Sequence, residues 1–586
     1  MLSAPLASAL RASLREGYGA KQLRADLLAG TVVGVVALPL SMALAIASGV
    51  PPQHGLYTAI VAGSLIALLG GSRVQVSGPT AAFVVILAPI ATRHGLGGLL
   101  VATLLAGLLL IAMGLAKFGE FIQFVPHPVT TGFTAGIAVV IGTLQLKDLL
   151  GLSVVEMPEH YVDRLEALWH ALPTAHWPDL AIGALTLALL VLWPRLDRRL
   201  PAPLVALTLG AVAALALAQA RPDFHVATIQ SQFFHEEGGV RVPGIPRHPP
   251  LPLLPWHLPG PDGAPISLSL GLVRLLLPSA FAIAMLGAIE SLLSAVVADG
   301  MTGKKHDPNA ELVAQGIGNV VAPFFGGIAA TGAIARTATN VRSGGRSPIA
   351  AVAHSVVVLG AVVLLAPLLG YVPMASLAAL MVLVAWNMSE ARHFVHILEV
   401  APRSDILVLL LCFGLTVVFD MVVSVTTGIV LSALLFMRRM AEVTGVRLVG
   451  ETHPDLEEPL PRGVLLYEIA GPLFFGAAQK AMAAIETVER RGLGVVILHM
   501  QAVPAIDATG LVALESLVSS LNDAGIKVIL GGVGGQPLRA FAKAGWRNRK
   551  GRLRIFQSFD TAVETARRHV AAGGATSGRT RAPEAP

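Results

Sequence analysis

The sequence predicts a polytopic α-helical membrane protein that carries a small α/β domain near its C-terminal end. Two observations support this fold class. The 586 residues are 54% hydrophobic and only 13% charged, with a mean hydropathy of +0.71, and long apolar runs alternate with short polar loops over the first three quarters of the chain. After Arg439 the apolar runs shorten to the length of strands and alternate with amphipathic stretches, as in a soluble domain.

Fourteen apolar runs are candidate membrane segments. They cover residues 27–47, 55–70, 78–92, 97–116, 129–146, 179–193, 201–219, 273–298, 311–328, 330–341, 348–369, 373–388, 405–419 and 420–437. The first run is not a cleaved signal peptide, because it is long enough to span and further spans follow it. The proline-rich segment 220–265 separates two sets of seven runs. Because each set has an odd number of spans, the second set enters the membrane from the side opposite to the first. Two corresponding sets with opposite orientations predict an inverted repeat.

The distribution of Lys and Arg predicts that both termini are cytoplasmic and that the protein lies in the inner (plasma) membrane. An even number of spans puts both ends on one side, and the short loops of that side are rich in basic residues: Arg73, Lys117, Arg195, Arg198, Arg199, Lys304, Lys305, Arg342, Arg346, Arg392 and Arg403. The opposite side has fewer basic residues in longer loops. The formal charge of +6 largely reflects these loops, so we expect no nucleic-acid binding.

The third and tenth runs, which are counterparts in the two sets, are both short and interrupted by Gly or Pro. They open at Val76-Ser-Gly-Pro-Thr-Ala-Ala82 and Ala330-Thr-Gly-Ala-Ile-Ala-Arg336. In transporters this pattern marks discontinuous helices whose N-terminal ends meet near the midplane and present partial positive charge. Arg336 is too costly to face lipid and points to a polar cavity. The pair predicts an anion site; alternatively, the small residues only allow close helix packing.

A second charge lies within an apolar run. Glu290 is about two thirds along the eighth run, and Ser294 follows one turn later on the same face. A carboxyl group there is neutralised most cheaply by a proton, unless a cation or Arg336 holds it charged. We therefore predict that Glu290 and Ser294 bind the coupling ion, which is a proton or alternatively sodium. The competing interpretation is a purely structural pair of Glu290 with Arg336.

Residues 37–57, 70–80 and 126–136 resemble the SulP sulfate permease family of anion transporters, and the resemblance continues through Glu290 and Arg336 to about residue 570. It implies a seven-plus-seven inverted repeat, a core domain that moves against a gate domain, and homodimers. The anion site of this family lies between the third and tenth helices. The positions expected to bind the anion here are Ser41, Gly78, Thr80, Ala81, Gly332, Ala333, Ile334 and Arg336.

The chain differs from the family at Leu40 and Leu44, where many members carry a glutamine and an aromatic residue, so the pocket is expected to be more apolar. Sodium-coupled bicarbonate members tend to have aspartate at the Glu290 position, whereas proton-coupled members have glutamate. These features predict a proton-coupled secondary transporter of a small anion, with sulfate favoured. The alternatives are a sodium-coupled bicarbonate or dicarboxylate transporter, or an anion-sensing membrane regulator. No phosphate-binding GxxxxGK[ST] sequence occurs, so we expect ion gradients rather than ATP to drive transport. We expect the protein not to be an enzyme and to bind no cofactor or metal.

The C-terminal part is expected to be a small α/β domain. Its predicted strands are 464–469, 495–500 and 528–530, and its predicted helices are 477–490 and 511–524. The loop Asp507-Ala-Thr-Gly510 resembles that of STAS domains, in which a serine after the aspartate can be phosphorylated. That position is Ala508 here. Thr509 is a possible acceptor; alternatively, Asp507 and Thr509 cap the helix that follows.

Four segments result: a cytoplasmic N-terminal segment, a transmembrane transporter domain, a STAS domain with a possible cytoplasmic partner, and a disordered tail. Their predicted bounds are 1–25, 26–440, 460–570 and 571–586.

Overall fold

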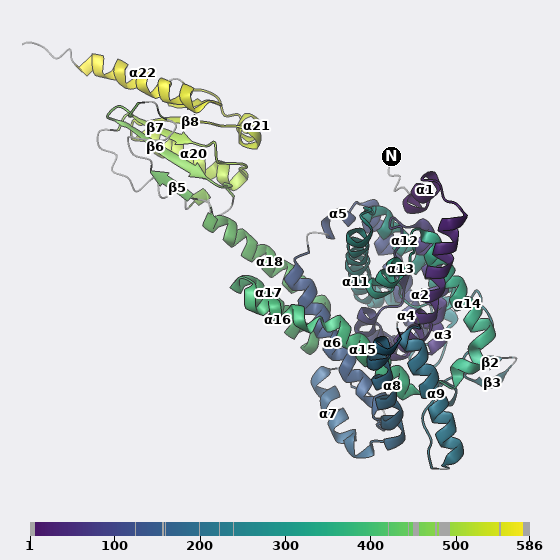
Figure 1. Ribbon diagram of the computed structural model, residues 1–586. Helices are drawn as coiled ribbons and strands as arrows, with labels where there is room; N and C mark the ends of the chain where they lie inside the picture. Colours follow the sequence, from purple (N-terminus) through teal and green to yellow (C-terminus); the bar gives the residue numbers. More distant parts are fainter. Residues whose placement is uncertain are drawn as a thin grey trace, which may run out of the picture. The chain divides into compact units, whose positions relative to one another are not determined.

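The computed structural model describes residues 6–577, apart from residues 123–124, 155–156, 159, 198–199, 222, 238, 420, 444, 449–455, 457, 475–477, 480–492 and 550–551. The chain divides into two compact units, Met1–Ile429 and Val430–Pro586. In Figure 1 the first unit is a bundle of helices and the second contains a sheet flanked by helices. The predicted fold class is confirmed.

The first unit is almost entirely helical. Its longer helices are α1 (Ser8–Arg15), α2 (Ala20–Ala47), α3 (Pro52–Leu69), α4 (Ala81–Leu115), α6 (His127–Leu149), α7 (Tyr161–Ala171), α8 (Trp177–Leu196), α9 (Ala202–Ala220), α11 (Leu270–Thr302), α12 (Pro308–Val321), α13 (Ile334–Arg342), α14 (Pro348–Gly370), α15 (Met374–Ser389), α16 (Ala391–Val400) and α17 (Arg403–Val418). Shorter elements are α5 (Gly119–Ile122), α10 (Ile229–Gln232), the hairpin of β2 (Phe234–Glu237) and β3 (Val240–Pro243), and the 3-10 helices η1 (Leu172–Thr174), η2 (Pro255–His257) and η3 (Ala322–Phe325). Helix α18 (Met421–Val443) extends from this unit into the second.

Each of the fourteen predicted runs overlaps a helix. The third and fourth runs lie in the single long element α4, which leaves helical geometry at Gly95, where φ is 67° and ψ is −178°. The tenth run is short because α13 has only nine residues. Ten helices of the described residues are long and apolar enough to cross a membrane. The count of fourteen spans stays a prediction.

The helices pack in two groups. In one, α12 and α11 pack on α4, and α14 packs on α2 and α3. In the other, α15 and α17 pack on α6, and α8 packs on α9 and α15. These groups correspond to the core and gate domains that the family resemblance implied.

Two very short strands join the two halves of the first group. Strand β1 (Ser77–Gly78) pairs antiparallel with β4 (Thr331–Gly332), so Ser77 lies opposite Gly332 and Gly78 opposite Thr331. Helix α4 begins shortly after β1 and helix α13 shortly after β4. The two interrupted runs therefore start side by side although more than 250 residues separate them, as the inverted repeat predicted.

The second unit contains a five-stranded sheet in the order β5-β6-β7-β8-β9, in which β5 is antiparallel and the other pairs are parallel. Its elements are β5 (Gly445–Leu448), β6 (Val464–Ala470), β7 (Val495–His499), α20 (Ala508–Asp523), β8 (Lys527–Gly531), α21 (Gly535–Lys543), β9 (Leu553–Ile555) and α22 (Phe559–Ser577). One apolar core joins the sheet to α20 and α21, and a second joins it to α22. The three predicted strands and the second predicted helix are present. The predicted helix 477–490 falls mostly outside the described residues.

The start of the predicted tail 571–586 overlaps the last helix, because α22 continues to Ser577. Alanine has the highest helix propensity, and Ala571, Ala572 and Ala575 offset the two glycines of this stretch.

The close contact between α4 and α12 depends on glycines at the crossing point. A Cβ atom added at Gly107 would lie 2.7 Å from the Gly316 carbonyl oxygen and 2.7 Å from the Val320 amide nitrogen. A Cβ atom added at Gly360 of α14 would meet nothing within 4 Å. Replacement by alanine would therefore cause a steric clash at Gly107 but none at Gly360.

We predict that Gly107→Ala lowers the midpoint of thermal unfolding in detergent, because overpacking of this kind costs about 1–3 kcal/mol. The matched variant Gly360→Ala should leave the midpoint unchanged or raise it, since alanine favours the helix. Equal midpoints for the two variants would contradict the close crossing of α4 and α12.

Candidate functional site

The site is built where the helices α4 and α13 begin. The Ala333 amide donates a hydrogen bond to the Val76 carbonyl oxygen at 2.9 Å, and the Thr337 hydroxyl accepts one from the Val76 amide at 3.1 Å. The N-cap residues are Thr80 and Ala333, and neither side chain caps its helix. The N-terminal ends of both helices thus direct partial positive charge and N–H groups to one place.

Arg336 lies at this junction and is only 2% exposed. Its guanidinium donates a hydrogen bond to the Pro79 carbonyl oxygen, whereas its Nε and Nη1 atoms have no partner among the described residues. A Cβ atom added at Gly78 would lie 2.5 Å from Nη1. Gly78 therefore makes room for the guanidinium, which holds a buried positive charge with unused donors.

Glu290 of α11 faces the same junction. The Thr80 hydroxyl donates a hydrogen bond to its Oε2 atom at 2.7 Å. The charges of Glu290 and Arg336 attract each other, but no ion pair within 4.0 Å joins them in the described part of the chain. The direct structural pair considered from the sequence is therefore not formed.

The structure brings most of the expected residues together. Gly78, Thr80 and Ala81 come from the β1–α4 connection, and Gly332, Ala333 and Arg336 come from β4 and α13. Ser294 is fully buried, and its hydroxyl lies 3.2 Å from that of Thr337. The described contacts link Ser294 to α13 and not to Glu290.

Two expected residues lie at the margin of this arrangement. Ser41 of α2 is fully buried, and its hydroxyl has no partner among the described residues. The described hydrogen bonds do not connect it with Thr80 or Arg336. Ile334 is 40% exposed, so its side chain is available to a ligand or to a neighbouring helix. Leu44 is 1% exposed, in keeping with an apolar surrounding.

The sequence analysis missed a third buried charge, Glu311 of α12, which is 1% exposed. Its Oε2 atom accepts hydrogen bonds from the amides of Gly71 and Ser72 at 2.9 and 3.1 Å. Its Oε1 atom accepts one from Gln75 Nε2 at 3.0 Å and one from the Ser291 hydroxyl at 3.4 Å. The carboxylate thereby fixes the segment that leads into β1.

Neighbouring amides extend this network to the strand. Gln315 Nε2 donates to the hydroxyls of Ser77 and Ser291 at 3.1 and 2.8 Å, and Asn319 exchanges hydrogen bonds with the backbone of Ala330 just before β4. Both strands of the junction are thus held by side chains of α12. Glu311 opens the predicted run 311–328, and this charge at the edge of an apolar run was the signal that could have identified it.

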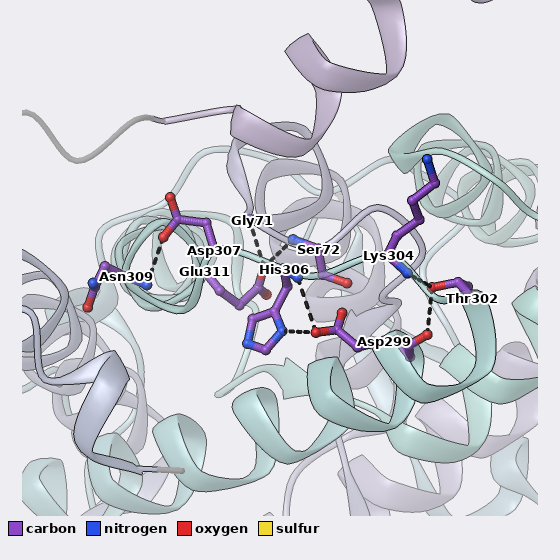
Figure 2. Close-up of polar contacts among 10 residues, drawn as sticks. Gly71, Ser72, Asp299, Thr302, Lys304, His306, Asp307, Asn309 and Glu311 are labelled. Carbon is purple, nitrogen blue, oxygen red and sulfur yellow. Dashed lines mark hydrogen bonds and ion pairs between the residues drawn. The ribbon is translucent and has the colours of Figure 1, made fainter. Parts of the chain in front are cut away.

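Figure 2 shows how the start of α12 is fixed beside Glu311. Asp307 caps the helix by accepting hydrogen bonds from the amides of Asn309 and Ala310 at 3.1 and 3.0 Å. The preceding residue, His306, places its Nδ1 atom 2.8 Å from Asp299 Oδ2. These contacts connect the end of α11 with the start of α12 and hold Glu311 in position.

In the second unit, the loop that resembles STAS domains has a clear structural role. The Gly510 amide donates a hydrogen bond to Asp507 Oδ1 at 2.7 Å, which caps α20. Thr509 is exposed, and no described hydrogen bond gives it a capping role. The capping interpretation therefore holds for Asp507, and Thr509 remains a possible site of modification.

Comparison with known proteins identifies both parts of the chain. A model of the Sulfate permease family matches residues 23–412, and a model of the STAS domain matches residues 456–562. The putative sulfate transporter YvdB of Bacillus subtilis is 40% identical over 545 residues, covering 93% of this chain and 98% of the relative. The bicarbonate transporter BicA of Picosynechococcus is 28% identical over 556 residues, covering 89% and 91%.

Solved structures with the same fold agree. Murine Slc26a9 in its inward-facing state superimposes with a TM-score of 0.81 at 19% identity, covering 96% of this chain and 94% of that chain. The transmembrane domain of a cyanobacterial BicA gives a TM-score of 0.58 at 28% identity, covering 71% and 98%. With the paired broken helices, the buried arginine and a family model that matches most of its length, this chain belongs to the sulfate permease family and carries a STAS domain.

Proposed function

We propose that the protein is a secondary transporter that carries a small anion across the inner membrane with sulfate as the favoured substrate. The observation that carries this proposal is the buried guanidinium of Arg336, whose Nε and Nη1 atoms have no partner among the described residues. It lies where two helix N-terminal ends converge. An anion that accepts hydrogen bonds there would satisfy these donors and offset the cost of burying the charge.

Sulfate is favoured because the relative that is 40% identical, YvdB, is named a putative sulfate transporter. Bicarbonate is the second candidate, because BicA relatives that are 27% and 28% identical are named bicarbonate transporters. The family resemblance places Leu40 and Leu44 beside the substrate, so we expect the substrate to lie next to apolar side chains. Either anion carries the negative charge that would complement the Arg336 guanidinium.

The position of Glu290 supports the proposal of proton coupling. When its carboxyl group is ionised, it partly cancels the charge of Arg336, and when it is protonated, the positive charge is fully available to an anion. The hydrogen bond from Thr80 to Glu290 ties the carboxyl group to the N-cap of α4. Proton binding and anion binding would then strengthen each other reciprocally.

We further propose that both termini and the STAS domain are cytoplasmic, that the protein works as a homodimer, and that a cytoplasmic partner acts through the STAS domain. The bias of Lys and Arg toward the loops on the side of the N-terminus supports this orientation. The same anion site could serve a sensor that signals without transport. Uptake of labelled sulfate into proteoliposomes, with and without a pH gradient, separates a transporter from a sensor.

We predict that Arg336→Ala weakens sulfate binding at least about tenfold, because a hydrogen bond to a charged group contributes about 1.5–3 kcal/mol. Arg342→Ala is the matched control, since Arg342 ends the same helix but is exposed. Binding is measured by isothermal titration calorimetry on protein that elutes as a single folded species. A folded Arg336→Ala protein that binds sulfate and bicarbonate like the parent would place the site elsewhere.

Gly78→Ala should also weaken sulfate binding, since the added methyl group would displace the Arg336 guanidinium. The effect should be smaller than that of Arg336→Ala, because the charge remains. Gly360→Ala provides the control for the general effect of an added methyl group. Unchanged affinity in Gly78→Ala would show that the position of the guanidinium does not control binding.

Glu290→Gln, which resembles the protonated acid, should retain sulfate binding and lose the acceleration of uptake by external acid. Glu399→Gln, which changes an exposed glutamate of α16, serves as the control. The measurement is initial uptake into proteoliposomes over a range of external pH. Parent uptake that requires sodium and ignores a pH gradient would instead support a sodium-coupled carrier in which Glu290 and Ser294 are ion ligands.

A further inference from the structure

The STAS domain has a pronounced separation of charge along the chain. Residues 524–559 contain eight basic residues and no Asp or Glu, whereas residues 456–523 contain eight acidic and four basic residues. The first of these segments thus has a larger net charge than the whole chain, for which the net charge is +6. The transmembrane topology does not explain this excess, because the segment lies far beyond the last membrane run.

The exposed part of this charge gathers on and directly after α21. Arg539 and Lys543 lie on α21, and Arg547 and Arg549 follow that helix. We call these four residues, which are all exposed, the basic face. Lys527 and Arg554 lie within β8 and β9 and point to the opposite side of the sheet, which α22 covers.

The basic face is not neutralised by the domain itself. In the described part of the second unit, the ion pairs are Arg438–Glu442, Arg567–Glu458 and Arg568–Glu564, and none involves a residue of the basic face. On the opposite side of the sheet, burial and the nearby charge of Arg554 lower the pKa of the Lys527 ammonium group. Burial and the charge of Lys527 likewise lower the pKa of the His569 imidazole. The basic face itself has no described counter-charge.

Protection of the sheet edge accounts for only part of this charge. Charged side chains on an edge strand prevent pairing with another sheet, and Arg552 and Arg554 at β9 can do this. Arg539 and Lys543 lie on a helix, where they cover no strand edge. The uniform sign over the helix and the loop after it instead indicates attraction of an extended negative surface.

The absence of a free aromatic ring at Trp546 argues against nucleic acid as the partner of the basic face. Single-stranded nucleic acid needs exposed aromatic rings on which bases stack, but the ring of Trp546 is already stacked on Phe541, with centroids 4.9 Å apart and an interplanar angle of 13°. A membrane is the anionic surface to which this chain is permanently attached. Attachment raises the local concentration of headgroups around the domain, so weak individual contacts suffice.

We propose that the basic face of the STAS domain binds anionic phospholipid headgroups of the membrane that anchors the chain. The proposal rests on the cytoplasmic placement of the domain given above. Each lysine or arginine near an anionic leaflet strengthens the attraction about fivefold, and the attraction falls with salt. Binding would bias the STAS domain toward the bilayer according to lipid composition.

The test uses the full chain in nanodiscs of phosphatidylcholine, with or without phosphatidylglycerol. Cys412 is the single cysteine and is buried, so a Cys412→Ser background accepts a fluorescent label at Ala544→Cys, an exposed position beside the basic face. Energy transfer to a labelled headgroup reports proximity. Both leaflets have the same composition and transport is not measured, so the result does not depend on the proposed transport function.

Energy transfer should rise with phosphatidylglycerol, fall in high salt, and be lost in a fourfold variant that removes exposed charge: Arg539→Gln, Lys543→Gln, Arg547→Gln and Arg549→Gln. A control variant with Arg462→Gln and Arg568→Gln, both outside the basic face, should behave like the parent. Equal transfer in both lipid mixtures would overturn the proposal. A soluble polyanion that binds the face when phosphatidylglycerol does not would identify an acidic macromolecule as the partner instead.

Discussion

The organising constraint of the transmembrane part is that charged side-chain groups, among them those of Glu290, Glu311 and Arg336, are buried where hydrocarbon cannot solvate them. Glu290, Glu311 and Arg336 belong to helices packed in one group, and each charge left without a partner would cost several kcal/mol. The start of α4 and α13 within the buried junction offsets part of this cost for Arg336. The helix N-terminal ends leave backbone N–H and C=O groups there without helical partners. The pairing of β1 with β4 provides hydrogen bonds for the backbone just before the two helices.

The three charges are treated differently. Four donors surround the carboxylate of Glu311, so this residue is a structural anchor for the segment before β1. Glu290 has one described donor, the Thr80 hydroxyl, and Arg336 retains donors without described partners. A buried charged group whose hydrogen-bonding capacity is fully used fixes the segments around it. A charged group with unused donors or acceptors can still bind a ligand. This difference separates the scaffold from the candidate site within the same group of helices.

The sequence predicted the helical segments, the meeting of the two broken helices, and the burial of Arg336 and of the Glu290 carboxyl group, because each depends on local composition. Apolar runs identify helices, and a charge inside such a run is conspicuous. The partners of these charges were not predicted. Glu311 lies at the edge of its run, and its donors Gly71, Ser72 and Gln75 are far away in the chain. The periodicity of apolar residues does not predict hydrogen bonds between residues so far apart in the sequence. These hydrogen bonds form only when β1 and β4 come together.

Ser294 illustrates the same limit over a short distance. Four residues along a helix place a side chain on the same face but turn it by about 40°. That rotation is enough to bring Ser294 to Thr337 of α13, although Glu290 is bonded to Thr80. Both contacts nevertheless join α11 to the two broken helices, one to the end of each. Helix α11 therefore contacts both helix ends. If Glu290 carries the proton as proposed, a change of its charge would act on the site through Thr80 without a direct ion pair with Arg336.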